Sequence, residues 1–578
     1  MRQKEQNTFF RVLKYFRPFI GLVCLAGFLA LVVNITDLAG PYIIKIAIDD
    51  YIVGEKAGGG IKLIGLLYFL SILVGACSNY FQNYVLNSIV QQIMHNIRME
   101  LFSHIQHLPL KFFDRNSSGR ILTRVTNDVE SLNEMYSGVL VILFKDVFLL
   151  IGIVATMLQL NRNLTFLSFS VVPIIVVVTF LYRTRARRNF KRVRALIGRI
   201  NGFLAENISG MKLVQIFHRE REKYREFKQL NEEYRRASIF EVALSALFRP
   251  SAELINNLGI SILIWYCTPR VFASTVEIGV LYAFISYIKK FFGPINDLAD
   301  KYNVILSGNV SAERIFELMD YDEGLERMES GRPLTELKGK IEFRNVWFSY
   351  NGEDWVLKDI SFTVNPGETV AFVGATGSGK TTIINLLSRF YQVQKGEILL
   401  DGVNINEYRL DDLRRRVAVV MQDVFLFAGT IESNIRLNNE EITPEEVQRA
   451  AEYVNADHFI GKLPGQYEAE VKERGCTLSA GERQLLSFAR AIAFNPSILV
   501  LDEATASIDT ETELLIQDSL GKIAKDRTTL IIAHRLSTIK KADRIIVIHK
   551  GRIREMGKHE ELLAQDGIYR NLYEMQYA

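Results

Sequence analysis

The chain has 578 residues, of which 48% are hydrophobic and 23% charged, and its formal net charge is +4. This length is too great for one ordinary domain, and the small net charge argues against a dedicated nucleic-acid binder. The four cysteines show no C-x-x-C or C-x-x-H spacing, so they indicate neither a disulfide framework nor a zinc site. Long apolar runs occupy the first half, whereas the last part has the composition of a soluble α/β domain.

The first half contains six segments that are long and apolar enough to cross a bilayer. Two connections between them, around residues 98–124 and 183–236, are long and basic, which places both of them and the N-terminus in the cytoplasm. Helical periodicity in these connections predicts helices that continue well beyond the bilayer. The six segments are Phe19–Ile48, Ile61–Leu86, Tyr136–Leu160, Leu164–Tyr182, Ala246–Cys267 and Glu277–Ala299.

Several polar or charged residues fall inside or beside these segments. A charge inside the membrane is costly and often lines a transport pathway. Long side chains near the end of a span can instead reach the interface. Both interpretations stay open, and the pathway interpretation is strongest for Lys289 and Lys290, which interrupt the sixth segment. The full set is Asn34, Asp37, Lys45, Lys145, Asp146, Lys289 and Lys290.

A linker is predicted where the chain becomes polar, after Ser311. The expected organisation is a membrane domain at 1–310, a linker at 311–340 and an α/β domain at 341–578. Within the α/β domain, the strand-like "TVAFV" is followed by "GATGSGKT" and a helical run, the context that a G-x-x-x-x-G-K-[ST] phosphate loop requires. Its glycines let backbone N–H groups approach phosphate oxygens, Lys380 supplies a cation to the β- and γ-phosphates, and Thr381 offers a hydroxyl to Mg²⁺.

Two further strand ends carry candidate catalytic groups. The buried-strand pattern "ILVL" ends in Asp502 and Glu503. The first acid can hold Mg²⁺ through water, and the second can orient or deprotonate an attacking water. The strand "TTLIIA" ends in His534, whose side chain could reach a γ-phosphate.

A second anion-binding pattern occurs in "CTLSAGERQ". Small residues and a hydroxyl at the start of a helix can bind phosphate. The same residues also fit a capping box, with Ser479 as the N-cap and Glu482 at the third helical position. The two interpretations are compatible, because the cap that starts the helix also orients its positive end.

Taken together, these residues resemble the ATP-binding-cassette (ABC) superfamily, and nearly the whole chain is similar to half-transporters of bacterial multidrug and lipid exporters. The resemblance implies six transmembrane helices followed by an α/β P-loop nucleotide-binding domain, in the cytoplasmic membrane with that domain in the cytoplasm. It also implies ATP-driven export of hydrophobic or amphipathic compounds by alternating access, with ATP and Mg²⁺ bound. The expected partners are a second half-transporter, membrane lipid and the exported compound, but no nucleic acid.

The resemblance also implies roles for particular residues. Tyr350 matches the aromatic residue that stacks on adenine, and Asp509 the D-loop. Residues 112–129 and 206–217 look like coupling helices that dock on nucleotide-binding domains. Expected catalytic residues are Glu503, His534 and Gln422, and expected Mg²⁺ ligands are Thr381, Gln422 and Asp502. Further ATP contacts are expected from Gly374, Thr376, Gly377, Ser378, Gly379, Lys380, Thr381 and Thr382.

The signature motif departs from the family pattern. Residues Ser479, Ala480, Gly481 and Glu482 stand where the family has Ser-Gly-Gly-Gln, and in the family this motif contacts ATP held by the partner subunit. This departure, beside Walker motifs of the usual form, resembles one subunit of a heterodimeric exporter. A homodimeric lipid flippase and an ATP-gated channel or regulator are the alternatives. The fused membrane segments argue against an importer and against a soluble ABC protein.

Overall fold

The computed structural model describes residues 11–54, 59–273, 275–322, 331–502, 510–525, 527–533 and 536–577. Its contacts divide the chain into two compact units. A helical unit comprises Met1–Ile105 and Gly119–Tyr321, and an α/β unit comprises Gln106–Ser118 and Asp322–Ala578. The α/β unit therefore includes a short segment from the first half of the chain.

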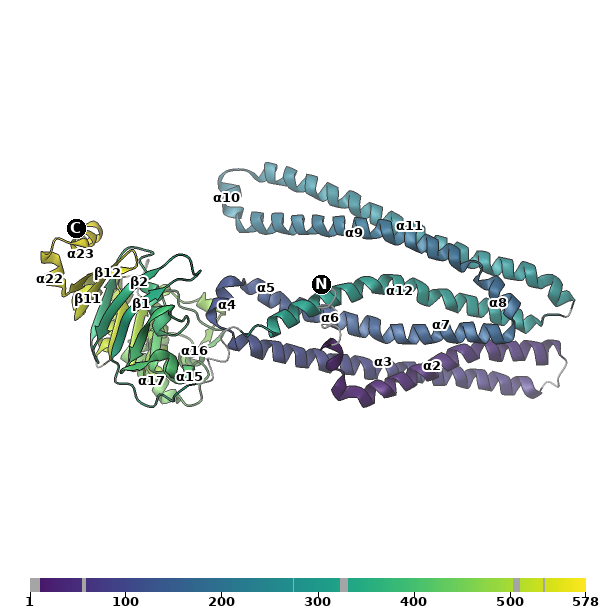
Figure 1. The fold of residues 1–578 in the computed structure, drawn as a ribbon, viewed down its shortest axis with the longest axis horizontal. Helices are drawn as coiled ribbons and strands as arrows, with labels where there is room; N and C mark the ends of the chain where they lie inside the picture. Colours follow the sequence, from purple (N-terminus) through teal and green to yellow (C-terminus); the bar gives the residue numbers. More distant parts are fainter. Residues whose placement is uncertain are drawn as a thin grey trace. The chain divides into compact units, whose positions relative to one another are not determined.

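Long helices dominate the helical unit (Figure 1). Within the described residues, three helical stretches are long and apolar enough to cross a membrane: Arg17–Val53, Gly60–His107 and Arg162–Ser209. The helices are α2 (Ile20–Ile46), α3 (Gly59–His107), α5 (Ser118–Thr123), α6 (Val129–Met135), α7 (Val141–Leu160), α8 (Arg162–Phe169), α9 (Val172–Ser209), α10 (Met211–Ile216), α11 (Glu220–Phe272) and α12 (Ile278–Met319), with π-helical turns at Ala47–Val53, Arg124–Asp128 and Tyr136–Leu140.

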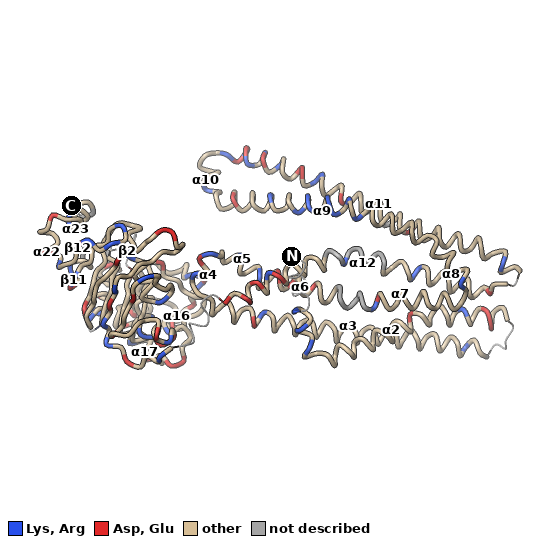
Figure 2. The backbone as a smooth tube through the Cα atoms, viewed as in Figure 1, with Lys and Arg blue, Asp and Glu red and all other residues tan. Residues whose placement is uncertain are grey.

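Several helices continue beyond the segments predicted to cross the membrane. The helix α11 has 53 residues and α3 has 49, whereas a bilayer core needs only about 20 residues of helix. Figure 2 shows charged residues along α9 and α11 on the side of α10. The prediction that helices extend past the bilayer through the basic connections is confirmed. The helix α12 also continues to Met319, inside the segment that the sequence assigned to the linker.

The fourth predicted segment, Leu164–Tyr182, differs from a single helix. The helix α8 ends at Phe169 and α9 begins at Val172, with Pro173 in its first turn. Proline has no N–H group to donate to the preceding turn, so it is tolerated where a helix begins rather than in its interior. The interruption therefore follows from one residue.

Apolar side chains in the helical unit are distributed unevenly. On α12, Phe284, Tyr287 and Ile288 are fully or almost fully buried. On α3, by contrast, large apolar side chains such as Leu63 and Phe69 are about 60% exposed. An exposed apolar surface on a helix of this length is what lipid would cover.

The α/β unit contains two main sheets (Figure 1). An antiparallel sheet has the order β2-β1-β4-β5, and a six-stranded sheet has the order β12-β11-β3-β10-β9-β6. The strands are β1 (Ile341–Phe348), β2 (Leu357–Val364), β3 (Thr369–Val373), β4 (Lys395–Leu400), β5 (Val403–Asn404), β6 (Val417–Val420), β7 (Gly429–Thr430), β8 (Glu470–Val471), β9 (Ile498–Asp502), β10 (Thr528–Ile532), β11 (Arg544–His549) and β12 (Arg552–Gly557).

The α/β unit also contains helices, most of which lie between its strands in the sequence. They are α4 (Leu110–Arg115), α14 (Lys380–Leu387), α15 (Leu410–Arg416), α16 (Ile431–Arg436), α17 (Pro444–Tyr453), α18 (Asp457–Ile460), α19 (Ala480–Ala493), α20 (Thr510–Ala524), α21 (Leu536–Lys541), α22 (His559–Ala564) and α23 (Ile568–Tyr577).

The register of the six-stranded sheet aligns the ends of its parallel strands. Ile532 of β10 pairs with Phe372 of β3 on one side and with Asp502 of β9 on the other. Leu501 of β9 pairs in turn with Val420 of β6. Because these strands are parallel, the loops that follow them leave the sheet at the same edge.

The start of β10 ties two loops to the centre of the α/β unit. The Thr528 hydroxyl donates to the carbonyl of Gly339 at 2.8 Å and accepts from the N–H of Gly367 at 3.1 Å. The side chain is almost fully buried. Its neighbour Thr529 is equally buried, but among the described residues its hydroxyl makes only a 3.4 Å bond, to the nearby carbonyl of Arg527.

We predict that Thr528→Val destabilises the α/β unit, because valine has the same shape and leaves both loop groups without their partner. A buried polar group without a partner costs about 1–3 kcal/mol, and each kcal/mol lowers Tm by about 2–4 °C in a unit of this size. Trp347 and Trp355 lie in this unit, so tryptophan fluorescence during heating of the purified full-length protein reports its unfolding. Thr529→Val is the matched control, and an equal loss of Tm in both variants would contradict the assignment.

Candidate functional site

The predicted phosphate loop connects β3 to α14, and its backbone needs glycine. Gly377 and Gly379 have φ values of +79° and +107°. A Cβ atom on Gly379 would lie 2.6 Å from Cδ2 of Leu357, whereas one on Gly377 would meet nothing within 4 Å. Gly379 is therefore required by both backbone conformation and space, whereas Gly377 is required by backbone conformation alone.

Lys380 occupies the first position of α14 and is 7% exposed. Its ammonium donates to the carbonyls of Gly374 and Ala375, at 2.6 and 3.1 Å. Burial lowers the pKa of Lys380, and the charge of Asp502 opposes that shift. The cation therefore lies on the phosphate loop itself, close to the carboxylate at the end of β9.

The hydroxyl of Ser378 is buried, and among the described residues it has no hydrogen-bond partner. A buried hydroxyl without a partner is costly in a native structure and calls for one. Its position in the loop, two residues before Lys380, fits a phosphate oxygen as the missing acceptor.

Oxygen donors follow two other strands to the same edge of the sheet. Asp502 ends β9, and Gln422 follows β6 by two residues and is exposed. Thr381 is exposed next to Lys380. A hydroxyl, an amide and a carboxylate are the hard oxygen ligands that Mg²⁺ prefers, so this donor set fits that ion. Glu503, Asp509 and His534 lie outside the described residues.

Tyr350 lies against the helix that follows the phosphate loop. Its hydroxyl is 3.2 Å from the hydroxyl of Thr382 and accepts from the amide of Asn385 at 3.3 Å. The Tyr350 ring meets the edge of Tyr391 at 5.0 Å between centroids. The Tyr391 hydroxyl in turn donates to the carboxylate of Asp114, on α4.

These contacts connect α14 to α4 through two tyrosine rings. Asp114 lies within residues 112–129, the first of the two predicted coupling regions, and α4 belongs to the α/β unit. Sequence analysis did not identify Tyr391. No local signal could have found it, since its partner Asp114 is 277 positions away.

The segment after Gln422 is held by two residues that sequence analysis also missed. Asn434, 1% exposed, accepts from the N–H of Phe427 at 2.9 Å and donates to its carbonyl at 2.8 Å. Arg490, on α19, donates to the carbonyls of Asn434 and Phe425, at 2.9 and 3.2 Å. Burial lowers the pKa of Arg490. The loop that carries Gln422 is therefore attached to the helix that begins at the signature motif.

The signature motif forms the capping box that the sequence suggested. The hydroxyl of Ser479 accepts from the N–H of Glu482 at 3.2 Å, and the carboxylate of Glu482 accepts from the N–H of Ser479 at 2.7 Å. Ser479 and Ala480 are exposed, whereas Gly481 is buried. A carboxylate thus occupies the positive end of α19, where the family pattern has a neutral amide.

Two family models match the chain. One describes the ABC transporter transmembrane region and matches residues 23–295, and the other describes the ABC transporter and matches residues 357–506. A probable multidrug resistance ABC transporter ATP-binding/permease protein, YheH of Bacillus subtilis, is 42% identical over 89% of this chain and 77% of its own length. An ATP-dependent lipid A-core flippase of Syntrophus aciditrophicus is 36% identical over 99% of this chain and 95% of its own.

The solved structures include a similar fold. A bacterial Atm1-family ABC exporter with ATP bound matches with a TM-score of 0.78 and 28% identity, over 97% of this chain and 98% of that one. The family models, the relatives and this fold agree with the phosphate loop and with the apolar helices. The chain belongs to the ABC transporter family: it is an ATP-hydrolysing exporter that crosses the cytoplasmic membrane several times and holds its nucleotide-binding domain in the cytoplasm.

Proposed function

We propose that this chain is one half of a dimeric exporter that moves hydrophobic or amphipathic compounds, drug-like molecules or lipids, across the cytoplasmic membrane. The observation that carries the proposal is the phosphate loop at the strand edge, with Lys380 on the loop and Asp502 close by, in one chain with long apolar helices. The names of the relatives, a multidrug resistance transporter and a lipid A-core flippase, support these two substrate classes.

The proposed reaction begins when ATP binds at the phosphate loop. The triphosphate replaces the loop carbonyls as the partner of Lys380, and the Ser378 hydroxyl gains a phosphate oxygen as acceptor. The adenine stacks on Tyr350, a residue that is 37% exposed. Glu503 orients the attacking water and His534 contacts the γ-phosphate, while Asp509 stands in the D-loop between the two cassettes.

Mg²⁺, when bound, neutralises charge that develops on the β- and γ-phosphates. Thr381, Gln422 and Asp502 would hold it. The signature residues Ser479–Glu482 complete the ATP site of the partner subunit, and closure of the two cassettes opens the helical units outward. Hydrolysis then returns the transporter to its inward-facing state.

We predict that Lys380→Ala lowers ATP hydrolysis by at least about 10- to 100-fold, because a charge-assisted hydrogen bond to phosphate contributes about 1.5–3 kcal/mol. In the same variant, ATP-dependent accumulation of a fluorescent phospholipid or an amphipathic dye in inside-out proteoliposomes should stop. Lys462→Ala, at an exposed lysine of the same unit, is the control. Unchanged ATPase in Lys380→Ala would contradict the site, and ATP-dependent equilibration without accumulation would favour a gated channel.

The proposed route from ATP to the membrane helices begins at α4. The rings of Tyr350 and Tyr391 lie between the phosphate-loop helix and Asp114, so a change at the adenine site can reach α4. The second predicted coupling region, residues 206–217, contains α10, and Leu213, Ile216 and the following Phe217 are each at least 60% exposed. We propose that it docks on the cassette of the partner.

We predict that Tyr391→Phe loosens α4, since phenylalanine keeps the ring contact with Tyr350 but cannot donate to Asp114. Hydrogen exchange of the α4 amides should become about two- to ten-fold faster, the range expected for one lost hydrogen bond. Tyr453→Phe is the control, because its hydroxyl donates to the carbonyl of Lys522 at 2.7 Å and is not bonded to α4. Equal exchange of α4 in the wild type and in Tyr391→Phe would contradict this route.

We favour a heterodimer because of the charge on the signature motif. Phosphate binds at a helix N-terminus through the positive end of the helix and its N–H groups. In α19, the Glu482 carboxylate is held at that end by the N–H of Ser479. It would repel the partner's ATP, so the site that this motif completes is proposed to be the weaker of two.

We predict that the chain purified alone hydrolyses ATP slowly, and that Glu482→Gln raises the rate about two- to five-fold, because a helix-end charge contributes about 0.4–1 kcal/mol. Glutamine preserves the capping box and removes the charge. Glu446→Gln is the matched control, since Glu446 forms the same box with Thr443 at the start of α17. Full ATPase and export by the wild-type chain alone would establish a homodimer instead.

A further inference from the structure

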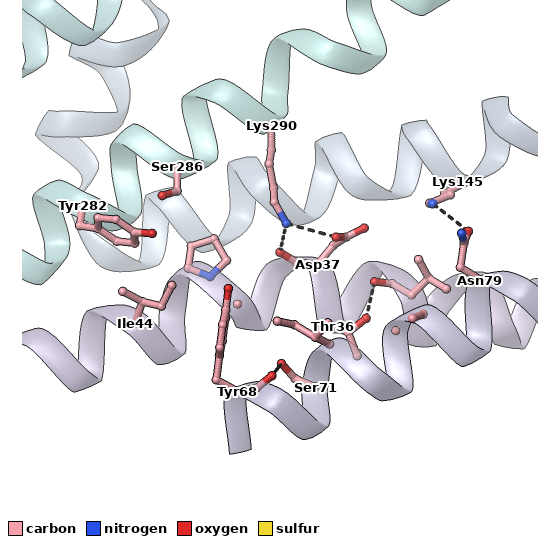
Figure 3. Close-up of a pocket in the computed structure, with 16 residues that line it drawn as sticks. Thr36, Asp37, Ile44, Tyr68, Ser71, Asn79, Lys145, Tyr282, Ser286 and Lys290 are labelled. Carbon is pink, nitrogen blue, oxygen red and sulfur yellow. Dashed lines mark hydrogen bonds and ion pairs between the residues drawn. The ribbon is translucent and has the colours of Figure 1, made fainter. Parts of the chain in front are cut away.

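A polar cavity of about 510 Å³ lies in the helical unit, lined by residues of α2, α3, α7 and α12 (Figure 3). Its size falls within the range of small-molecule sites, about 300–1,000 Å³. Its lining includes apolar side chains, such as Val33 and Ile44 of α2 and Ile72 of α3. Asp37, Lys145 and Lys290 also line it, so the cavity combines apolar and charged groups, as does a compound with a polar head and an apolar body.

The first charged pair in the cavity is already balanced. The ammonium of Lys290 donates to the carboxylate of Asp37 at 3.1 Å and to the carbonyl of the same residue at 2.7 Å. Figure 3 shows these two side chains reaching across the cavity from α12 and α2. Each is a little more than one-third exposed, so the pair is open to a bound molecule.

The second cation, Lys145, is not balanced in this way. Its ammonium donates to the side-chain oxygen of Asn79 at 3.4 Å, which is a long bond to a neutral group. Among the residues that the structure describes, no carboxylate forms an ion pair with Lys145, and the neighbouring Asp146 pairs with Lys301 at 3.4 Å. Counting Lys145, Lys290 and Asp37, the cavity carries one more positive than negative charge.

A cation between membrane helices is costly unless a counter-charge meets it. The partner that Lys145 lacks among the described residues is therefore an anion, and the apolar lining residues indicate that this anion has an apolar body. Lys290 lies on the same cavity, and Asp37 holds its ammonium in place. The cavity therefore offers a second ammonium group besides that of Lys145.

We propose that this cavity binds the acidic headgroup of an amphipathic substrate, a carboxylate or a phosphate, with Lys145 as its counter-ion and Lys290 as a second donor. The inference rests on the proposed export function and narrows its substrate class. Neutral polar groups such as Ser286 and Tyr282 of α12 also line the cavity.

The test measures binding without ATP, so that it does not depend on turnover. The purified full-length protein in phosphatidylcholine nanodiscs is titrated with radiolabelled oleate, lysophosphatidate and neutral monoolein. We expect the wild type to bind at least one of the two acids more tightly than monoolein. Tighter binding of oleate assigns a carboxylate headgroup, and tighter binding of lysophosphatidate assigns a phosphate.

Variants connect this preference to the cavity. Lys145→Gln should weaken binding of the preferred acid about 10-fold, the loss expected for one charge-assisted hydrogen bond, and leave monoolein unchanged. Lys145→Arg should restore binding, and Lys62→Gln, at an exposed residue of α3, is the control. Basal ATPase measures whether each variant is folded.

Equal affinity of the wild type for the acids and for monoolein would overturn the inference, and so would equal acid affinity of Lys145→Gln and Lys62→Gln. Dodecyltrimethylammonium, a cationic amphipath, is titrated as a further probe. Tighter binding of this cation than of either acid would also overturn the inference. The comparison of probes on the wild type does not depend on the folding of any variant. Loss of acid selectivity with intact ATP-driven accumulation would refute this site alone, whereas failure of accumulation in the wild type would refute the export function.

Discussion

Parallel pairing of β3, β10 and β9 is the constraint on which the nucleotide site depends. The loops of this sheet leave its strands at one edge only because Phe372, Ile532 and Asp502 are in register. A shift of one residue would turn every side chain of a strand to the opposite face. The position of Lys380 on the phosphate loop and its proximity to Asp502 are therefore consequences of main-chain hydrogen bonding in a buried sheet.

Helix ends supply the second level of organisation. The α14 helix begins at Lys380, and α19 begins with a capping box whose two members bond each other. Arg490 then connects α19 to the loop that follows Gln422. The same local chemistry that starts a helix thus determines which charge the helix end presents, and here that charge is negative at the signature motif.

In the helical unit, the environment that apolar and charged side chains require is the reverse of that in the α/β unit. Its apolar side chains can be exposed, because lipid covers them, and its charged side chains must find partners between helices. Lys290 finds Asp37, and Lys301 finds Asp146, whereas Lys145 meets only a neutral amide among the described residues. Charge balance, rather than hydrophobicity, therefore distinguishes one cavity of this unit from its surroundings.

The sequence by itself determined the features that depend on neighbours along the chain. The phosphate loop, the capping box of Ser479 and Glu482 and the extension of helices through basic connections are set by residues a few positions apart. Asp502 was also predictable, because a buried apolar strand ends there. The interruption between α8 and α9 was not predicted, although Pro173 carried the signal.

Only the tertiary structure decided which side chains meet across the fold. Asp114 and Tyr391 are 277 positions apart, and Asp37 and Lys290 are 253 apart. The sequence treated Lys289 and Lys290 alike, yet the first is exposed and the second lines the cavity. Successive residues of a helix are rotated by about 100°, so their partners depend on how the helix is turned against its neighbours. That rotation is set by the packing of whole helices, which no short stretch of sequence contains.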